Sequence, residues 1–282
     1  MHSKSLEITC YVCGAGAFGV FFRWLQVMMA FDEQGLNEKS AFNVLVPLII
    51  LAAAWMFNRF INQFRAQRLY VDKDYCQALY NPGKLFAAAR WTAGGLMMIG
   101  ALVLFIAAET DVNAELLRIL AIFAFVSGVS FPVVLGAANY DELAHVPMLR
   151  FFMLLPVLLY SLWLIVSYKQ NSYNSVPWDY AIEMVSIISA ILAYFRVMGF
   201  AFFVVDGRKC MFAVMMCGML SIMNLADGRY MGMQMIILAT AAQMALYVWI
   251  LIFNLKKREK KKRPEDEAPV VDEGGFSHIR RI

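Results

Sequence analysis

Apolar residues fill eight stretches of the chain, and each is about as long as a helix that crosses a lipid bilayer. The stretches cover roughly residues 8–30, 41–64, 87–108, 113–139, 147–168, 177–205, 209–225 and 231–255. At 1.5 Å per residue, a helix needs about 20 residues to cross about 30 Å of hydrocarbon. Short polar strings separate the stretches, as at residues 32–35, 81–83 and 206–209. The pattern predicts an all-α, polytopic membrane bundle of about eight helices.

Two of the eight stretches are weaker than the others. Arg23 interrupts the first stretch, and the seventh is short. A seven-helix bundle is therefore the alternative. The first stretch has no clean small-x-small cleavage site, so we interpret it as a retained helix rather than a secretory signal.

Composition supports the membrane assignment and leaves little room for a soluble domain. The chain has 282 residues, of which 61% are apolar and 16% charged, and its mean hydropathy is +0.60. Soluble domains average roughly 45–50% apolar and about 25% charged residues. We expect two parts: a transmembrane bundle over residues 1–255, and a cytoplasmic, disordered tail over residues 256–282 that is first basic and then acidic.

The distribution of Lys and Arg predicts the orientation. With both termini in the cytoplasm, eighteen of the 25 basic residues lie inside, four lie outside and three lie within helices. Cytoplasmic loops of membrane proteins carry such an excess. The sequence therefore predicts a multi-pass protein of the cell (plasma) membrane with both termini cytoplasmic.

A cluster of seven cations follows directly after the last apolar stretch. Each such cation is worth about 1 kcal/mol of attraction to anionic lipid headgroups near the surface. The cluster is thus a candidate contact with those headgroups at the cytoplasmic face, or simply the anchor that fixes topology. Its members are Lys256, Lys257, Arg258, Lys260, Lys261, Lys262 and Arg263.

Residues 14–19 read Gly-Ala-Gly-Ala-Phe-Gly and fit the G-x-G-x-x-G pattern of dinucleotide-binding sites. That fingerprint needs a preceding strand, whereas these glycines lie inside an apolar stretch. Small residues four apart, Ala15 with Gly19 and Cys13 with Ala17, instead allow close approach of another helix. We expect helix packing and no nucleotide.

Neither the methionines nor the histidines predict a metal site or a cofactor. Met211, Met215, Met219 and Met223 form a stripe that would suit Cu(I), but thioethers more often fill gaps in a core. The three histidines lie in the termini and one loop. We therefore expect no metal, no cofactor and no nucleic-acid partner.

Charges inside the apolar stretches are the best candidates for a site, because an unpaired charge in lipid is costly. Arg23 lies seven residues, or about 10 Å, from the outer end of its helix. Glu183 and Arg118 lie at similar depths in the sixth and fourth stretches.

One face of the sixth stretch is polar. Its residues at helical spacing are Asp179, Glu183, Ser186, Ala190 and Tyr194. Our hypothesis is an outward-facing polar pocket in which Arg23 and Arg118 meet Glu183, with Glu115 and Asp179 at its mouth. The alternative is a structural ion-pair cluster that fixes helix order.

The biochemical activity is not encoded in any recognisable motif. The sequence contains no H-E-x-x-H, G-x-S-x-G or P-loop string, which argues against an enzyme. The absence of catalytic and repeat signatures favours a non-catalytic sensor, scaffold or accessory subunit of a membrane complex, with a membrane protein as its partner. The alternative is a transporter of a small solute or ion that uses the polar pocket.

Overall fold

The computed structural model describes residues 2–32, 35–36, 41–110, 114–140, 142, 146–172 and 177–257. Eight of its helices are long and apolar enough to cross a membrane, which confirms the prediction of an all-α, polytopic bundle and favours eight spans over seven. These helices are α1 (His2–Ala30), α2 (Phe42–Ala66), α4 (Lys84–Ala107), α5 (Ala114–Ala137), α7 (Pro147–Asn171), α8 (Pro177–Met198), α9 (Gly207–Met223) and α10 (Met231–Phe253).

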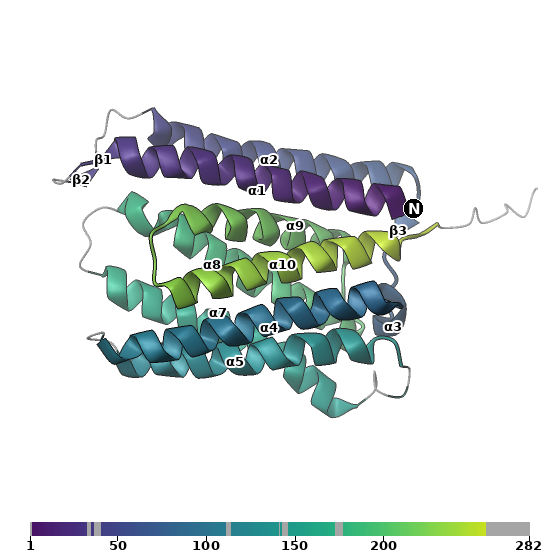
Figure 1. Cartoon of the computed structure of the whole chain (residues 1–282). Coiled ribbons are helices and arrows are strands. Elements are labelled where there is room, and N and C mark those ends of the chain that lie inside the picture. The colour runs from purple at the N-terminus through teal and green to yellow at the C-terminus, as the bar shows by residue number, and fades with distance from the viewer. Residues whose placement is uncertain are drawn as a thin grey trace, which may run out of the picture.

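The remaining elements are short and lie between or after the long helices. They are the helix α3 (Tyr75–Ala78), the 3₁₀ turns η1 (Ala108–Thr110), η2 (Gly199–Phe202) and η3 (Asn224–Ala226), and the strands β1 (Phe31–Asp32), β2 (Gly35–Leu36), β3 (Leu69–Tyr70) and β4 (Lys256–Lys257). β1 pairs antiparallel with β2, and β3 with β4. The first described residues and the end of α10 lie at the same end of the bundle (Figure 1), as an even number of crossings requires.

Six of the long helices form a closed ring of neighbours. α4 packs on α5, α5 on α7, α7 on α8, α8 on α9, α9 on α10, and α10 closes the ring on α4. α1 packs against α9 and α10, and α2 packs mainly against α1 (Figure 1). In the most apolar part of each span, 72% of α10 but only 22% of α2 is buried. α10 is therefore the core helix, and α2 mostly faces the surroundings of the bundle.

Glycines set the closest helix contacts in the ring. A Cβ at Gly94 of α4 would lie 2.6 Å from the carbonyl oxygen of Gly128 in α5. A Cβ at Gly232 of α10 would lie 2.4 Å from the backbone nitrogen of Leu104 in α4. In lipid, helices associate largely through such close packing of small residues. α4 is thus held on two sides by backbone-to-backbone contact.

The glycine-rich part of α1 packs against α9, which confirms helix packing as its role. A Cβ at Gly16 would lie 2.7 Å from Cβ of Ile222, and one at Gly19 would lie 3.2 Å from Cγ of Met223. The closest approach therefore uses Gly16 with Gly19 rather than the expected pairs of small residues four apart. The reason is that α1 buries one stripe at spacings of three and four, namely Ser5, Ile8, Val12, Gly16, Gly19, Arg23 and Gln26.

The segment between α2 and α4 is tied to the bundle by side-chain amides. Nδ2 of Asn81 donates to the carbonyl oxygens of Leu79 and Leu135, both at 2.7 Å. Nδ2 of Asn254 donates to the carbonyl oxygens of Ala78 (3.0 Å) and Tyr80 (2.7 Å). These bonds dock the four-residue helix α3 on the end of α10.

Of the predicted basic cluster, only Lys256 and Lys257 lie within the described residues. Nζ of Lys256 donates to Oδ2 of Asp72 at 3.0 Å. Burial opposes ionisation of Asp72, but the hydrogen bond and charge of Lys256, together with hydrogen bonds from the backbone of Asp74 and Lys73, lower the pKa of Asp72 below its ordinary value. Arg258, Lys260, Lys261, Lys262 and Arg263 lie outside the described residues, as does the rest of the predicted tail.

Candidate functional site

Four charged side chains form a continuous series at the end of the bundle opposite the one where α1 begins and α10 ends. Nε of Arg23 lies 2.8 Å from Oδ1 of Asp227, and Nη2 of Arg229 lies 3.7 Å from the other oxygen of Asp227. Nη1 of Arg229 lies 2.8 Å from Oε2 of Glu183. We call Arg23, Asp227, Arg229 and Glu183 the charge network. Its formal charges cancel.

Different elements supply the members of this network. Arg23 belongs to the buried stripe of α1, and Glu183 lies in the second turn of α8. Asp227 and Arg229 lie in the short connection between η3 and α10. The network therefore joins α1 and α8 to the turn that links α9 to α10.

Burial makes the pairing energetically necessary. The side chains of Arg23 and Glu183 are each 1% exposed, that of Asp227 is 7% exposed and that of Arg229 is 17% exposed. Taking an ion out of water costs several kcal/mol, and removing one partner of a buried pair typically costs about 3–5 kcal/mol. Arg229 is the member most open to solvent and so the one that a ligand reaches first.

Neutral amides extend the network toward α2 and α10. Nη1 of Arg23 donates to Oε1 of Gln26 at 2.8 Å, and Nε2 of Gln26 donates to Oδ1 of Asn43 in α2 at 3.0 Å. Nε2 of Gln234 in α10 donates to the carbonyl oxygen of Asp227 at 3.3 Å. Movement of the turn that carries Asp227 would therefore disturb hydrogen bonds that reach α2 and α10.

A polar pocket of about 190 Å³ lies against the accessible side of the network. Asp227, Gly228 and Arg229 form one wall, and Val27 of α1, Asn171 of α7 and Tyr180 of α8 line the rest. The pocket offers the guanidinium group of Arg229 beside the carboxylate of Asp227, and the guanidinium group suits a small carboxylate or another oxyanion.

Toward the interior of the bundle, Glu183 contacts a stack of aromatic side chains. Nε1 of Trp163 donates to Oε1 of Glu183 at 3.2 Å. Tyr160 stacks on Trp163 and on Tyr194, with both centroid separations 5.7 Å. We call Trp163, Tyr160 and Tyr194 the aromatic column.

Side chains of α10 satisfy the hydroxyl groups of the aromatic column. The hydroxyl of Tyr160 bonds to that of Thr240, and the hydroxyl of Tyr194 donates to Oε1 of Gln243. Gln243 lies near the middle of α10, and its Nε2 contacts Sδ of Met97 at 3.5 Å. A series of hydrogen-bonded and stacked side chains thus runs from the pocket beside Arg229 to the middle of the bundle, and its atoms are packed together.

The structure brings together some of the residues proposed from the sequence and separates others. Arg23 and Glu183 belong to one network, but they are connected through Asp227 and Arg229 rather than directly. Arg118 lies elsewhere: its side chain is 42% exposed, pairs with Glu109 at 3.9 Å and lies over the ring of Phe105.

The other proposed residues divide in the same way. Glu115 is exposed, and the side chain of Asp179 lies outside the described part of the structure. Glu183, Ser186, Ala190 and Tyr194 are all buried, so the polar face of α8 does point into the bundle.

Asp227 and Arg229 are functional candidates that no pattern in the sequence singles out. They read as ordinary residues of a loop outside the membrane. Their signal was charge balance, because Arg23 and Glu183 each require an opposite charge at the same end of the bundle, and this short loop carries one of each sign.

The described residues contain no group of three or more His, Cys, Asp or Glu side chains that could hold a metal ion. The methionine stripe of α9 lies in the core, where Met211, Met215, Met219 and Met223 are at most 2% exposed. These thioethers fill space between helices.

Comparison with known proteins adds no family to this description of a polytopic α-helical membrane protein. No family model, no curated protein and no solved structure matches the chain.

Proposed function

We propose that the protein is a non-catalytic sensor or accessory subunit of the cell membrane, with both termini cytoplasmic, and that the charge network is its responsive joint. The observation that carries this proposal is the position of Arg229. It holds buried Glu183 and contacts Asp227, yet it also lines the polar pocket. One accessible side chain therefore supports two buried charges on separate elements.

A small oxyanion in the pocket would compete with Glu183 and Asp227 for the guanidinium of Arg229. Loss of that contact leaves a buried carboxylate uncompensated, which is costly in a low-dielectric interior. The turn between α9 and α10 would then shift relative to α8 and α1. A ligand can shift such an equilibrium only by its difference in affinity for the two arrangements, and the exchange of partners at Arg229 supplies that difference.

Substitution of Arg229 tests this proposal, with Arg118 as a matched control. Arg118→Gln removes the same charge at the same end of the bundle but outside the network. We expect acetate or phosphate to raise the melting temperature of the wild type and of Arg118→Gln in lipid nanodiscs, because a ligand of the native state stabilises it. The rise should be absent in Arg229→Gln. Equal responses of the two variants would refute the role of Arg229.

Transport of a small solute or ion is the second candidate function. The observation in its favour is the polar route from Glu183 through the aromatic column to Gln243. Proteoliposomes loaded with a pH-sensitive dye, or assayed for uptake of radiolabelled organic acids, would detect it. A flux that Gln243→Leu abolishes while the protein stays folded would replace the sensor proposal by transport.

A further inference from the structure

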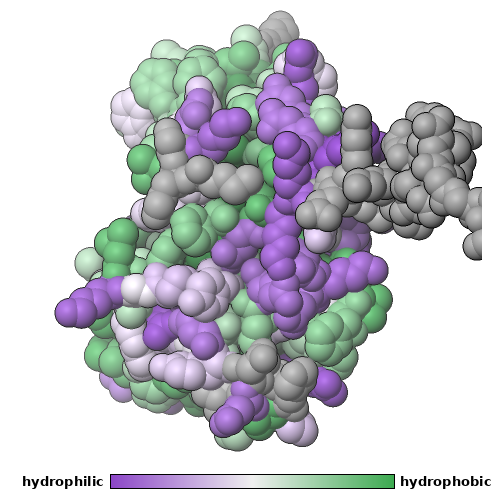
Figure 2. Space-filling model, turned by 90° about the vertical axis from the view of Figure 1, so that its right-hand side faces the viewer, coloured by the Kyte–Doolittle hydropathy of each residue, from purple (hydrophilic) through white to green (hydrophobic). Residues whose placement is uncertain are grey.

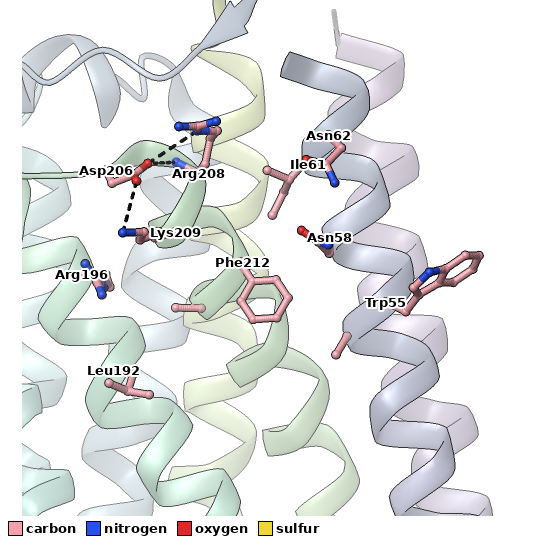
Figure 3. Close-up of a pocket in the computed structure, with 12 residues that line it drawn as sticks. Trp55, Asn58, Ile61, Asn62, Leu192, Arg196, Asp206, Arg208, Lys209 and Phe212 are labelled. Carbon is pink, nitrogen blue, oxygen red and sulfur yellow. Dashed lines mark hydrogen bonds and ion pairs between the residues drawn. The ribbon is translucent and has the colours of Figure 1, made fainter. Parts of the chain in front are cut away.

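A groove separates α2 from α8 and α9 at the end of the bundle where α1 begins and α10 ends. Its volume is about 640 Å³. Asn58 and Asn62 line it from α2, Arg196 from α8, and Arg208, Lys209 and Phe212 from α9 (Figure 3). We call it the α2–α9 groove. It is remote from the charge network, which lies at the opposite end.

The part of the groove nearest the end of the bundle is positively charged. Three cations line it, and Asp206 is the single carboxylate among the lining residues. Asp206 is shared by Arg208 and Lys209, each at 3.8 Å, and also accepts from the backbone N–H of Arg208 as the cap of α9 (Figure 3). The groove therefore keeps a formal excess of two positive charges.

Of the three cations, Arg196 lies deepest in the groove (Figure 3). It lies in the last turn of α8 and is half-buried. Within the described part of the chain it makes no ion pair, whereas Arg208 and Lys209 share Asp206. A half-buried guanidinium in a spanning helix favours an anionic partner.

Two asparagines face the groove from α2, of which only 22% is buried in its most apolar part. Asn58 and Asn62 lie four residues apart, hence on one face of α2, and both are exposed. At the helical rise they lie about 12 Å and about 6 Å from the end of α2. Among the described residues neither side-chain amide has a hydrogen-bond partner, and an amide left unsatisfied in an apolar medium is unfavourable. A ligand with hydrogen-bonding oxygens at this depth would satisfy both.

Toward the middle of the bundle, the lining of the groove becomes apolar. Leu192, Phe212, Ala54 and Ala213 line this part, and Leu192 is 51% exposed. The groove is thus cationic toward the end of the bundle and apolar toward its middle. Figure 2 shows that hydrophilic residues also gather in a band across that end, as expected for the level of the lipid headgroups.

We propose that the α2–α9 groove is a binding site for one anionic phospholipid. The phosphate lies among Arg196, Arg208 and Lys209, the amides of Asn58 and Asn62 donate to its glycerol and ester oxygens, and an acyl chain follows Leu192 and Phe212. Charge complementarity and the polar-to-apolar gradient favour this occupant over a soluble anion, which would leave the apolar part of the groove empty, and over a protein helix, which would leave the cations unpaired.

Lipid retention measured by native mass spectrometry tests the proposal. The full chain is purified in mild detergent and titrated with phosphatidylglycerol or with phosphatidylcholine of the same acyl chains. We expect one tightly retained phosphatidylglycerol, bound about tenfold more weakly by Arg196→Gln, because a charge-assisted hydrogen bond is lost. Lys84→Gln is the matched control, since it removes an exposed cation at the same end but outside the groove.

A second variant and a competitor make the test decisive. Asn62→Leu leaves every cation in place and should also weaken retention, by a few-fold. Equal retention of the two lipids, or equal affinity of Arg196→Gln and Lys84→Gln, would overturn the proposal. Displacement of the lipid by millimolar inorganic phosphate would show a soluble-anion site instead. A change in oligomeric state of the variants without a change in lipid retention would show a contact between copies of the chain.

Discussion

Arg23 shows at the residue scale how a charge is kept inside the membrane-spanning part of this protein. Asp227 neutralises it and Gln26 accepts a further hydrogen bond. Arg59, by contrast, is exposed and lies over the ring of Trp55. Position relative to the buried stripe of a helix, rather than residue type, therefore decides whether a charge needs a partner.

Two adjacent glycines of α4 give the sharpest prediction at this scale. Gly94 faces the backbone of α5, whereas a Cβ at Gly95 would meet nothing within 4 Å. Gly94→Ala should destabilise the bundle by about 1–3 kcal/mol through overpacking. Gly95→Ala should be neutral or stabilising by up to about 1 kcal/mol, because alanine favours the helix. Unfolding in mixed micelles of increasing SDS content measures both, and a similar loss in the two variants would contradict the α4–α5 contact.

At the scale of elements, six helices form a ring, and α1 and α2 form a hairpin that packs beside it. α10 is mostly buried, whereas α2 touches the remainder of the bundle chiefly through α1. Near the termini, the connection from α2 to α4 gains its order from amide bonds to the end of α10. The order of these elements thus depends on these amide bonds together with the burial of apolar side chains such as Val71, Tyr75 and Leu79.

Asn254 is the side chain whose removal should loosen that connection. Asn254→Ala deletes both bonds to the carbonyl oxygens of Ala78 and Tyr80. We expect faster hydrogen exchange in residues 69–80, while exchange in α10 before residue 250 stays unchanged. Asn171→Ala is the control, since it removes an amide bond at the opposite end of the bundle. Unchanged exchange in residues 69–80 would contradict the docking of α3 by Asn254.

The two ends of the bundle differ in charge at the scale of the whole molecule. Exposed cations at the end with the termini include Arg65, Arg68, Lys73, Lys84 and Lys256. Hydrophilic residues form a band across that end (Figure 2). By the positive-inside rule, these cations support our proposal that this end lies in the cytoplasm.

Cysteine labelling from each side of the membrane tests the orientation. Lys84 and Lys169 are both exposed and lie at opposite ends of the bundle. An impermeant maleimide should label Lys169→Cys in intact cells and Lys84→Cys only after permeabilisation. Maleimide labelling of the five cysteines of the wild-type chain gives the background level. The reverse pattern would invert the orientation and place the charge network at the cytoplasmic face.

The composition of the candidate site could be only half predicted from the sequence. Arg23 and Glu183 stood out because each is a charge at helical depth within an apolar stretch. Their partners did not, because a residue in a short loop is chemically ordinary until the loop is seen to fold over the end of the bundle. Arg118 was grouped with them on depth alone, and depth does not tell which way a side chain points around its helix.

The sequence by itself determined the all-α, polytopic class, about eight spans with seven as the alternative, and the excess of cations at one end of the bundle. These follow from local chemistry, because a run of apolar residues must satisfy its own backbone in lipid and does so as a helix. The tertiary structure alone decided the helix neighbours, the pairing of Arg23 with Asp227 and of Glu183 with Arg229, and the groove beside α2. Each depends on the rotation and order of helices, which is set by close packing between segments far apart in the chain.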